Sequence, residues 1–158
     1  MLVTLTRNEG KPHVLRCVRD DGSVTWFQAS ASNADFFAAH DLSHYAIETV
    51  LNYRTAFYGM VAAGRDLNDF GSQEGAADPR KYSDEAMFAE EMANLVVLAL
   101  REGYEFGAFW EVLAMAHDDS RPMPLVSPVQ YEAIKSKLGD LLDAWRVLDV
   151  GGSLTLKF

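Results

Sequence analysis

Two histidines four residues apart are the side chains in this sequence best suited to chemistry. They are His40 and His44, in the segment His-Asp-Leu-Ser-His. On a helix, residues four apart lie on the same side, one turn from each other. Two imidazoles in that arrangement can bind one divalent metal ion through their ring nitrogens. The spacing therefore predicts a metal site, with Zn²⁺ as the first ion to consider.

Two nearby carboxylates are the candidate catalytic residues. In the zinc peptidase motif His-Glu-x-x-His, the Glu acts as general base on a metal-bound water. Asp41 occupies that position here, with a side chain one methylene shorter. Glu48 can reach the ring of His44 and orient it, but it is about 12 Å along the helix axis from His40. We expect Asp41 or Glu48 to handle protons or to orient the imidazoles.

A metal site needs at least one ligand beyond the two histidines. Glu91 is the preferred third ligand, because it falls inside the apolar arc of a predicted helix, where an unpaired carboxylate is costly to bury. Glu90 borders the same face and is the second choice, and His117 is a further candidate. A competing hypothesis needs no metal, since Arg54 also projects from an apolar face and can pair with Glu91 or Glu48.

The elements that must position these residues follow from hydrophobic periodicity. Alternation predicts strands over residues 2–6, 13–19, 23–28, 146–150 and 153–158. Helical periodicity predicts a short turn ending at residue 39 and helices over 41–63, 83–102, 105–116 and 127–145. Residues 65–82 are predicted to form a long loop. The fold class is a single α+β domain, in which a small antiparallel sheet from the N- and C-terminal strands packs against about four helices.

Local signals define several ends of these elements. Ser32 or Asn33 can cap the short turn, and Ser83 can cap the helix that follows the loop. Ser127-Pro128-Val129-Gln130 combines an N-cap Ser, a Pro in the first turn and a Gln three residues after the cap. Asp20-Asp21-Gly22 predicts a hairpin turn, and Gly64 predicts the end of the long helix.

Composition excludes several classes of partner. The chain has 158 residues, with 23 acidic and 14 basic side chains, and its net charge of -9 disfavours nucleic acid and anionic lipid. The longest apolar run, residues 95–100, is too short to cross a bilayer, and the N-terminal residues lack the pattern of a signal peptide. We therefore expect a cytoplasmic protein. The single cysteine, Cys17, is predicted to be a small core residue and not a nucleophile.

Two resemblances involve the histidine segment. His40-Asp-Leu-Ser-His44-Tyr-Ala-Ile-Glu48, followed by residues 56–60 and 64–70, resembles a group of small uncharacterised bacterial proteins that share a His-Asp-Leu-x-His-Tyr-x-x-Glu opening. The segment is also similar to the His-Asp-x-x-His zinc motif of ubiquinone-biosynthesis scaffold proteins. That motif has a Glu twelve residues after its second His, and Ala56 occupies the position here.

Two functional hypotheses follow from these observations. The first is a divalent-metal protein, hydrolase-like, with His40, His44 and Glu91 as ligands and a small molecule as its ligand or substrate. The second is a non-catalytic binding or assembly module in which the histidines only support packing. A homodimer is compatible with both hypotheses and required by neither.

Overall fold

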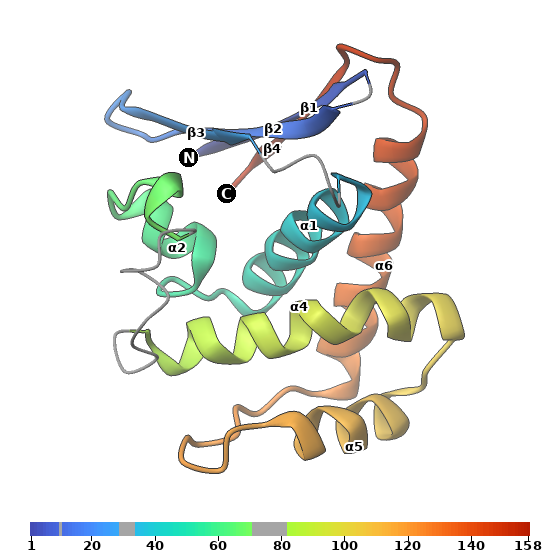
Figure 1. The fold of residues 1–158 in the computed structure, drawn as a ribbon. Coiled ribbons are helices and arrows are strands. Elements are labelled where there is room, and N and C mark those ends of the chain that lie inside the picture. Colours follow the sequence, from blue (N-terminus) through green and yellow to red (C-terminus); the bar gives the residue numbers. More distant parts are fainter. Residues whose placement is uncertain (10, 29–33, 71–81) are drawn as a thin grey trace.

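A four-stranded antiparallel sheet forms one side of the molecule (Figure 1). The computed structural model describes residues 1–9, 11–28, 34–70 and 82–158. The strands are β1 (Leu2–Asn8), β2 (Lys11–Val18), β3 (Val24–Gln28) and β4 (Ser153–Lys157). Their order is β3-β2-β1-β4, so the last strand of the chain pairs with the first. The predicted α+β fold, with a sheet built from both ends of the chain, is confirmed.

The helices lie on one side of this sheet. They are α1 (Ala34–Leu51), α2 (Phe57–Ala62), the 3₁₀ helix η2 (Leu67–Asp69), α4 (Asp84–Glu102), α5 (Phe106–Ala116) and α6 (Pro128–Arg146). Helix α1 packs against β2, α4 and α6, which makes it the centre of the fold. In Figure 1, α4 crosses on the side of α1 away from the sheet, and α5 lies farthest from the sheet.

Helix α1 is enclosed on all sides over its middle turns. Every residue from 42 to 48 is buried. A helix buried in this way has no solvent-facing side for its polar residues, so each of them needs a partner within the protein. Ser43 finds one in its own helix, because its hydroxyl donates to the carbonyl oxygen of Ala39 at 2.8 Å. His44 and Glu48 must find theirs on other elements.

The predicted helix over residues 41–63 is wrong, because two helices occupy the region. Helix α1 already includes Ala34 and ends at Leu51, so His40 lies well inside it. Asn52 then adopts a left-handed conformation with φ of 56°, and the amide of Tyr53 donates to the carbonyl of Glu48. This is the Schellman arrangement that ends many helices. The chain restarts in α2 and stops near Gly64, as predicted.

The predicted strand over residues 146–150 is also wrong. Helix α6 continues through Arg146, and a turn leads from it into β4. The side chain of Arg7 holds this turn by donating to the carbonyl oxygens of Arg146 and Leu148 at 3.0 and 2.9 Å. Those carbonyls are therefore satisfied without a neighbouring strand.

Most of the predicted helix caps and turns are confirmed. Ser83 caps α4, Ser127 and Gln130 form a reciprocal capping box at α6, and Gly22 has a positive φ in the hairpin turn. Cys17 is a buried core residue, and burial raises the pKa of its thiol to about 12. The predicted cap at Ser32 or Asn33 and residues 71–81 of the predicted loop lie outside the described residues.

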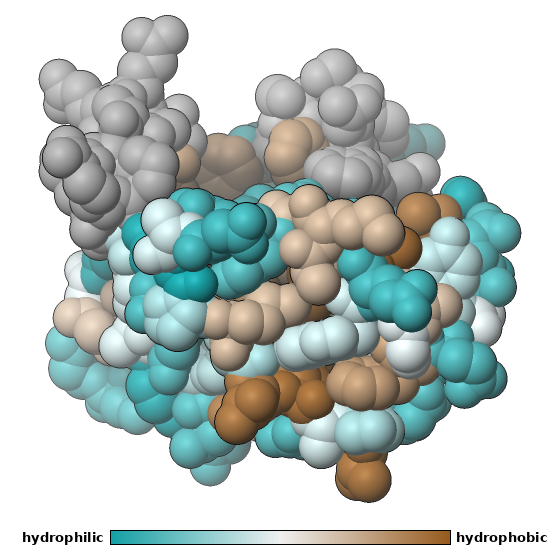
Figure 2. All heavy atoms as spheres, turned by 90° about the horizontal axis from the view of Figure 1, so that it is seen from below, coloured by the Kyte–Doolittle hydropathy of each residue, from teal (hydrophilic) through white to brown (hydrophobic). Residues whose placement is uncertain are grey.

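The surface around α5 carries exposed apolar side chains. They are Val112, Met115, Leu125 and Val129. Figure 2 looks at the molecule from below and shows its apolar residues as separate patches among hydrophilic ones. Such scattered exposure does not by itself mark an interface, so the homodimer stays a prediction. Within the described residues, the longer helices all fall short of the apolar character that a membrane-spanning helix requires.

Candidate metal centre

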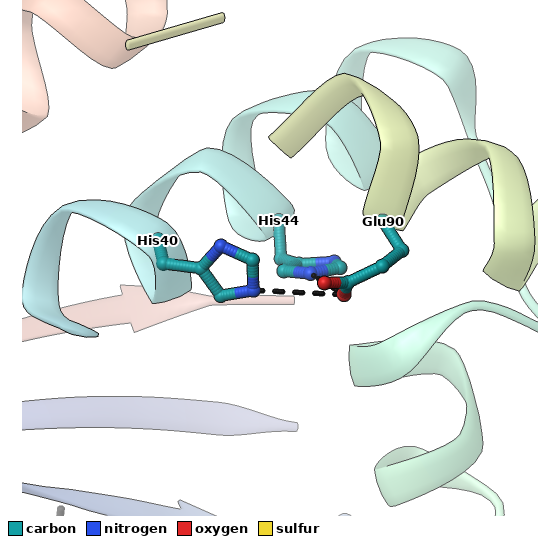
Figure 3. Close-up of side chains that lie close together, drawn as sticks. All are labelled: His40, His44 and Glu90. Atoms are coloured by element: carbon teal, nitrogen blue, oxygen red, sulfur yellow. Dashed lines mark hydrogen bonds and ion pairs between the residues drawn. The ribbon is translucent and has the colours of Figure 1, made fainter. Parts of the chain in front are cut away.

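Three side chains from two helices converge at the candidate site (Figure 3). His40 and His44 project from neighbouring turns of α1, and Glu90 reaches toward them from α4. Oε2 of Glu90 lies 3.1 Å from Nε2 of His44 and 3.5 Å from Nε2 of His40. One possible ligand atom from each residue lies within 4.8 Å of the others. This group can hold a metal ion.

The spacing of these atoms is close to that of donors around zinc. Donors at the usual zinc distances of about 2.0–2.2 Å are about 3.4 Å apart in a tetrahedral site. The two measured nitrogen–oxygen distances, 3.1 and 3.5 Å, lie on either side of that value. The two imidazoles meet edge to face, with ring centroids 4.8 Å apart. The two nitrogen–oxygen pairs are therefore spaced as zinc donors are, and one ligand atom from each of the three residues lies within 4.8 Å of the others.

Glu48 lies behind His44, on the side away from Glu90. Its Oε1 is 3.4 Å from Nδ1 of His44, within ion-pair distance but without hydrogen-bond geometry. The carboxylate itself is fully buried. It accepts hydrogen bonds from the backbone amides of Tyr58 and Gly59 at 3.2 and 3.1 Å, in the first turn of α2. Helix N-termini stabilise negative charge in this way, which offsets the cost of burying Glu48.

The charged groups at this site shift one another's pKa values toward the charged forms. Burial by itself lowers the pKa of His44, but the carboxylates of Glu48 and Glu90 outweigh burial and raise it to about 9. His40 and then His44 hold the pKa of Glu90 well below its usual range. Without a metal, the neighbouring carboxylates therefore favour the protonated form of the His44 ring.

Asp41 is paired with a histidine that sequence reasoning overlooked. Nε2 of His13 lies 2.7 Å from Oδ2 of Asp41, and the His13 side chain is buried. His13 is on the same face of β2 as the buried residues Leu15 and Cys17, and that face packs against α1. Alternate residues of a strand lie on the same face, so the spacing of these three residues could have predicted that His13 lies near α1. Nδ1 of His13 has no hydrogen-bond partner among the residues described.

Glu91, the preferred third ligand from sequence, is not part of this group. Its Oε2 lies 2.7 Å from Nδ1 of His117, just beyond the end of α5. The two residues partner each other, which explains why a carboxylate occupies a mostly apolar face of α4. The competing hypothesis about Arg54 is wrong, because Arg54 is exposed and its guanidinium donates to Asn52 instead of pairing with Glu91 or Glu48.

A pocket of about 410 Å³ opens beside the three ligands. His40, His44, Glu90 and Asp41 all line it, whereas Glu48 does not. The rest of its described wall consists of apolar and aromatic side chains from the sheet, α1, α2, η2 and α4, together with Phe70 and Tyr82. Pockets of a few hundred Å³ are the usual size for small-molecule sites. The three candidate ligands thus face a space that can hold a small molecule.

Comparisons of the chain with protein-family models, with curated proteins and with solved structures find no match.

Proposed function

We propose that this protein binds one divalent metal ion through His40, His44 and Glu90 and uses it in a hydrolase-like reaction on a small molecule. The convergence of three ligand atoms on the wall of a pocket carries this proposal. A structural metal site is usually closed by four protein ligands, whereas a catalytic site has three and leaves a position for water or substrate. Two histidines and one glutamate match the second pattern.

Zinc is the first metal to test. Two histidines and a glutamate are the ligand set of the thermolysin class of zinc peptidases. The same donors also suit Fe²⁺ in an open two-histidine, one-carboxylate site, so the test must include other divalent ions. A metal ion bound here would polarise a substrate carbonyl and acidify a bound water.

The two candidate catalytic carboxylates have different surroundings, which supports different roles. Asp41 lines the pocket and is held by His13, which supports a role in accepting a proton from an attacking water. Glu48 is buried behind His44 and does not line the pocket. We assign it a positioning role, in which it fixes the orientation of the His44 ring.

Elemental analysis of protein purified without a histidine tag tests the proposal. We expect close to one equivalent of Zn, Fe, Mn, Ni or Co in the wild type and none in His44→Ala, with circular dichroism confirming that the variant is folded. Chelation should also lower the melting temperature of the wild type, because an ion bound only to the folded state stabilises it. A wild-type protein that is metal-free and binds none of these added ions would overturn the proposal.

A second candidate function keeps the same residues without a metal. Nε2 of His44 is within direct hydrogen-bond distance of Glu90, which favours a structural ion pair joining α1 to α4. In that case the protein is a non-catalytic binding or assembly module. The same analysis separates the two, because the module contains no metal and its melting temperature does not change with chelator.

A further inference from the structure

The pocket beside the metal ligands has two chemically distinct parts. Of the fourteen described residues that line it, ten are apolar or aromatic. The four polar residues come from two short stretches, residues 40–44 of α1 and residue 90 of α4. The charged and metal-ligating groups of the described wall are therefore gathered at one place, and the remainder is apolar or aromatic, with a hydroxyl on Tyr82.

Aromatic contacts join the two parts directly. The ring of Phe57 lies 5.4 Å from the ring of His44 and 4.7 Å from that of Phe70, measured between centroids. Apolar surface therefore begins next to a metal ligand and continues away from it. A ligand atom bound at the metal would place the rest of the molecule against this surface.

The described wall beyond the candidate ligands and Asp41 offers no cation to a charged ligand body, because its ten residues are apolar or aromatic. Arg65 packs against the rings of Phe70 and Tyr82, at 4.3 and 4.9 Å, but it is not itself a lining residue. An uncharged apolar group gains most from such a wall, since its burial removes apolar area from water without desolvating a charge.

We infer that the ligand of this pocket is a small molecule with an uncharged apolar body and one polar group that reaches the metal site. This inference rests on the proposed metal function and adds to it the chemical class of the ligand. It assigns the aliphatic and aromatic wall, including Met60 of α2, the role of specificity determinant.

Hydroxamates test this inference, because their head group chelates metal ions while the tail can be varied. Calorimetry on the zinc-loaded protein would compare acetohydroxamate, hexanohydroxamate and the monohydroxamate of adipic acid, which has an anionic tail. Each buried methylene should strengthen binding about fourfold, so we expect hexanohydroxamate to bind on the order of 100-fold more tightly than acetohydroxamate. The adipic compound should lose most of that gain.

A matched pair of variants tests whether the longer tail gains its affinity from the pocket wall. Met60→Gln places a polar group in the wall and should reduce the advantage of the longer tail several-fold, without changing zinc content or acetohydroxamate affinity. Met115→Gln makes the same change on an exposed residue of α5, 83% accessible and outside the pocket, and should alter none of these quantities.

The outcomes distinguish the two proposals. A protein that binds none of the added divalent ions overturns the proposed function itself. A protein that binds zinc and acetohydroxamate, but gains nothing from the longer tail or prefers the anionic one, overturns only the inference about ligand class. Hexanohydroxamate binding that is unchanged after zinc removal also overturns this inference, because the polar group would then not reach the metal.

Discussion

Nε2 of His44 and Oε2 of Glu90 lie 3.1 Å apart, although 46 residues separate them in the chain. The contact exists because α1 and α4 pack against each other at the centre of the fold. It completes a group that also includes His40 and that faces a pocket.

Neighbouring glutamates on α4 should differ in their effect on metal binding. Glu90→Gln removes the anionic ligand, and we expect metal affinity to fall by more than the 10–100-fold that is typical for loss of an outer partner. Glu91→Gln makes the same chemical change one residue away, where the carboxylate pairs with His117, and should leave one equivalent of metal bound. Metal titration followed by elemental analysis measures both. Equal losses in the two variants would contradict the assignment of Glu90.

Glu48→Gln should weaken metal binding through His44. The amide cannot accept from both backbone amides of α2 as the carboxylate does, so we expect a loss of about 1–3 kcal/mol in the free energy of unfolding. We also expect metal affinity to fall 10–100-fold, as for other outer partners of metal-bound histidines. Glu132→Gln, on the surface of α6, is the control and should change neither value. A folded Glu48→Gln protein with wild-type metal affinity would rule out the positioning role.

Gly59 should not tolerate a side chain. A Cβ at this position would overlap the backbone carbonyl of Arg54, and its amide is one of the two that hold Glu48. We expect Gly59→Ala to cost about 1–3 kcal/mol in urea denaturation, the usual range for overpacking. Gly139→Ala is the control, since a Cβ there on α6 meets nothing within 4 Å. It should stabilise the protein by about 0.5–1 kcal/mol, because alanine favours a helix over glycine. Equal stability of the two variants would contradict this packing.

The His117–Glu91 pair should make stability depend on pH. The hydrogen bond that the His117 ring donates to the Glu91 carboxylate raises the pKa of His117 in the folded state. Its contribution to stability is therefore fully present below the unfolded pKa of about 6.5 and is lost as the pH rises through the higher folded value. We expect the stability difference between wild type and Glu91→Gln to be larger at pH 5.5 than at pH 9. Measurement in chelator removes any contribution from bound metal. A difference that stays constant or grows with pH would exclude this pair as its source.

The sequence was a good guide wherever the determinants are local. The Ser127–Gln130 capping box, the Ser83 cap and the hairpin at Gly22 depend on residues within a few positions of one another, and all three were predicted. The end of α1 was also signalled locally, by Asn52. That signal was missed because apolar residues continue at helical spacing through residue 61.

The partners of the two glutamates on α4 could not be predicted from local signals. Glu90 and Glu91 are adjacent on α4, so their side chains project about 100° apart. Periodicity placed Glu91 on the apolar side but did not distinguish the part of that side that meets α1 from the part that meets α5. The distinction depends on the angle at which three helices pack, which is set by contacts between residues far apart in sequence.

The His40–His44 spacing by itself therefore determined that two imidazoles share one side of a helix, because helix geometry is local and repeats every 3.6 residues. Only the tertiary structure decided what faces them. It placed Glu90 within 3.5 Å of both rings, His13 against Asp41 and a pocket of about 410 Å³ in front. These neighbours come from separate helices and a strand, and they meet because burying α1 on all sides brings those elements together.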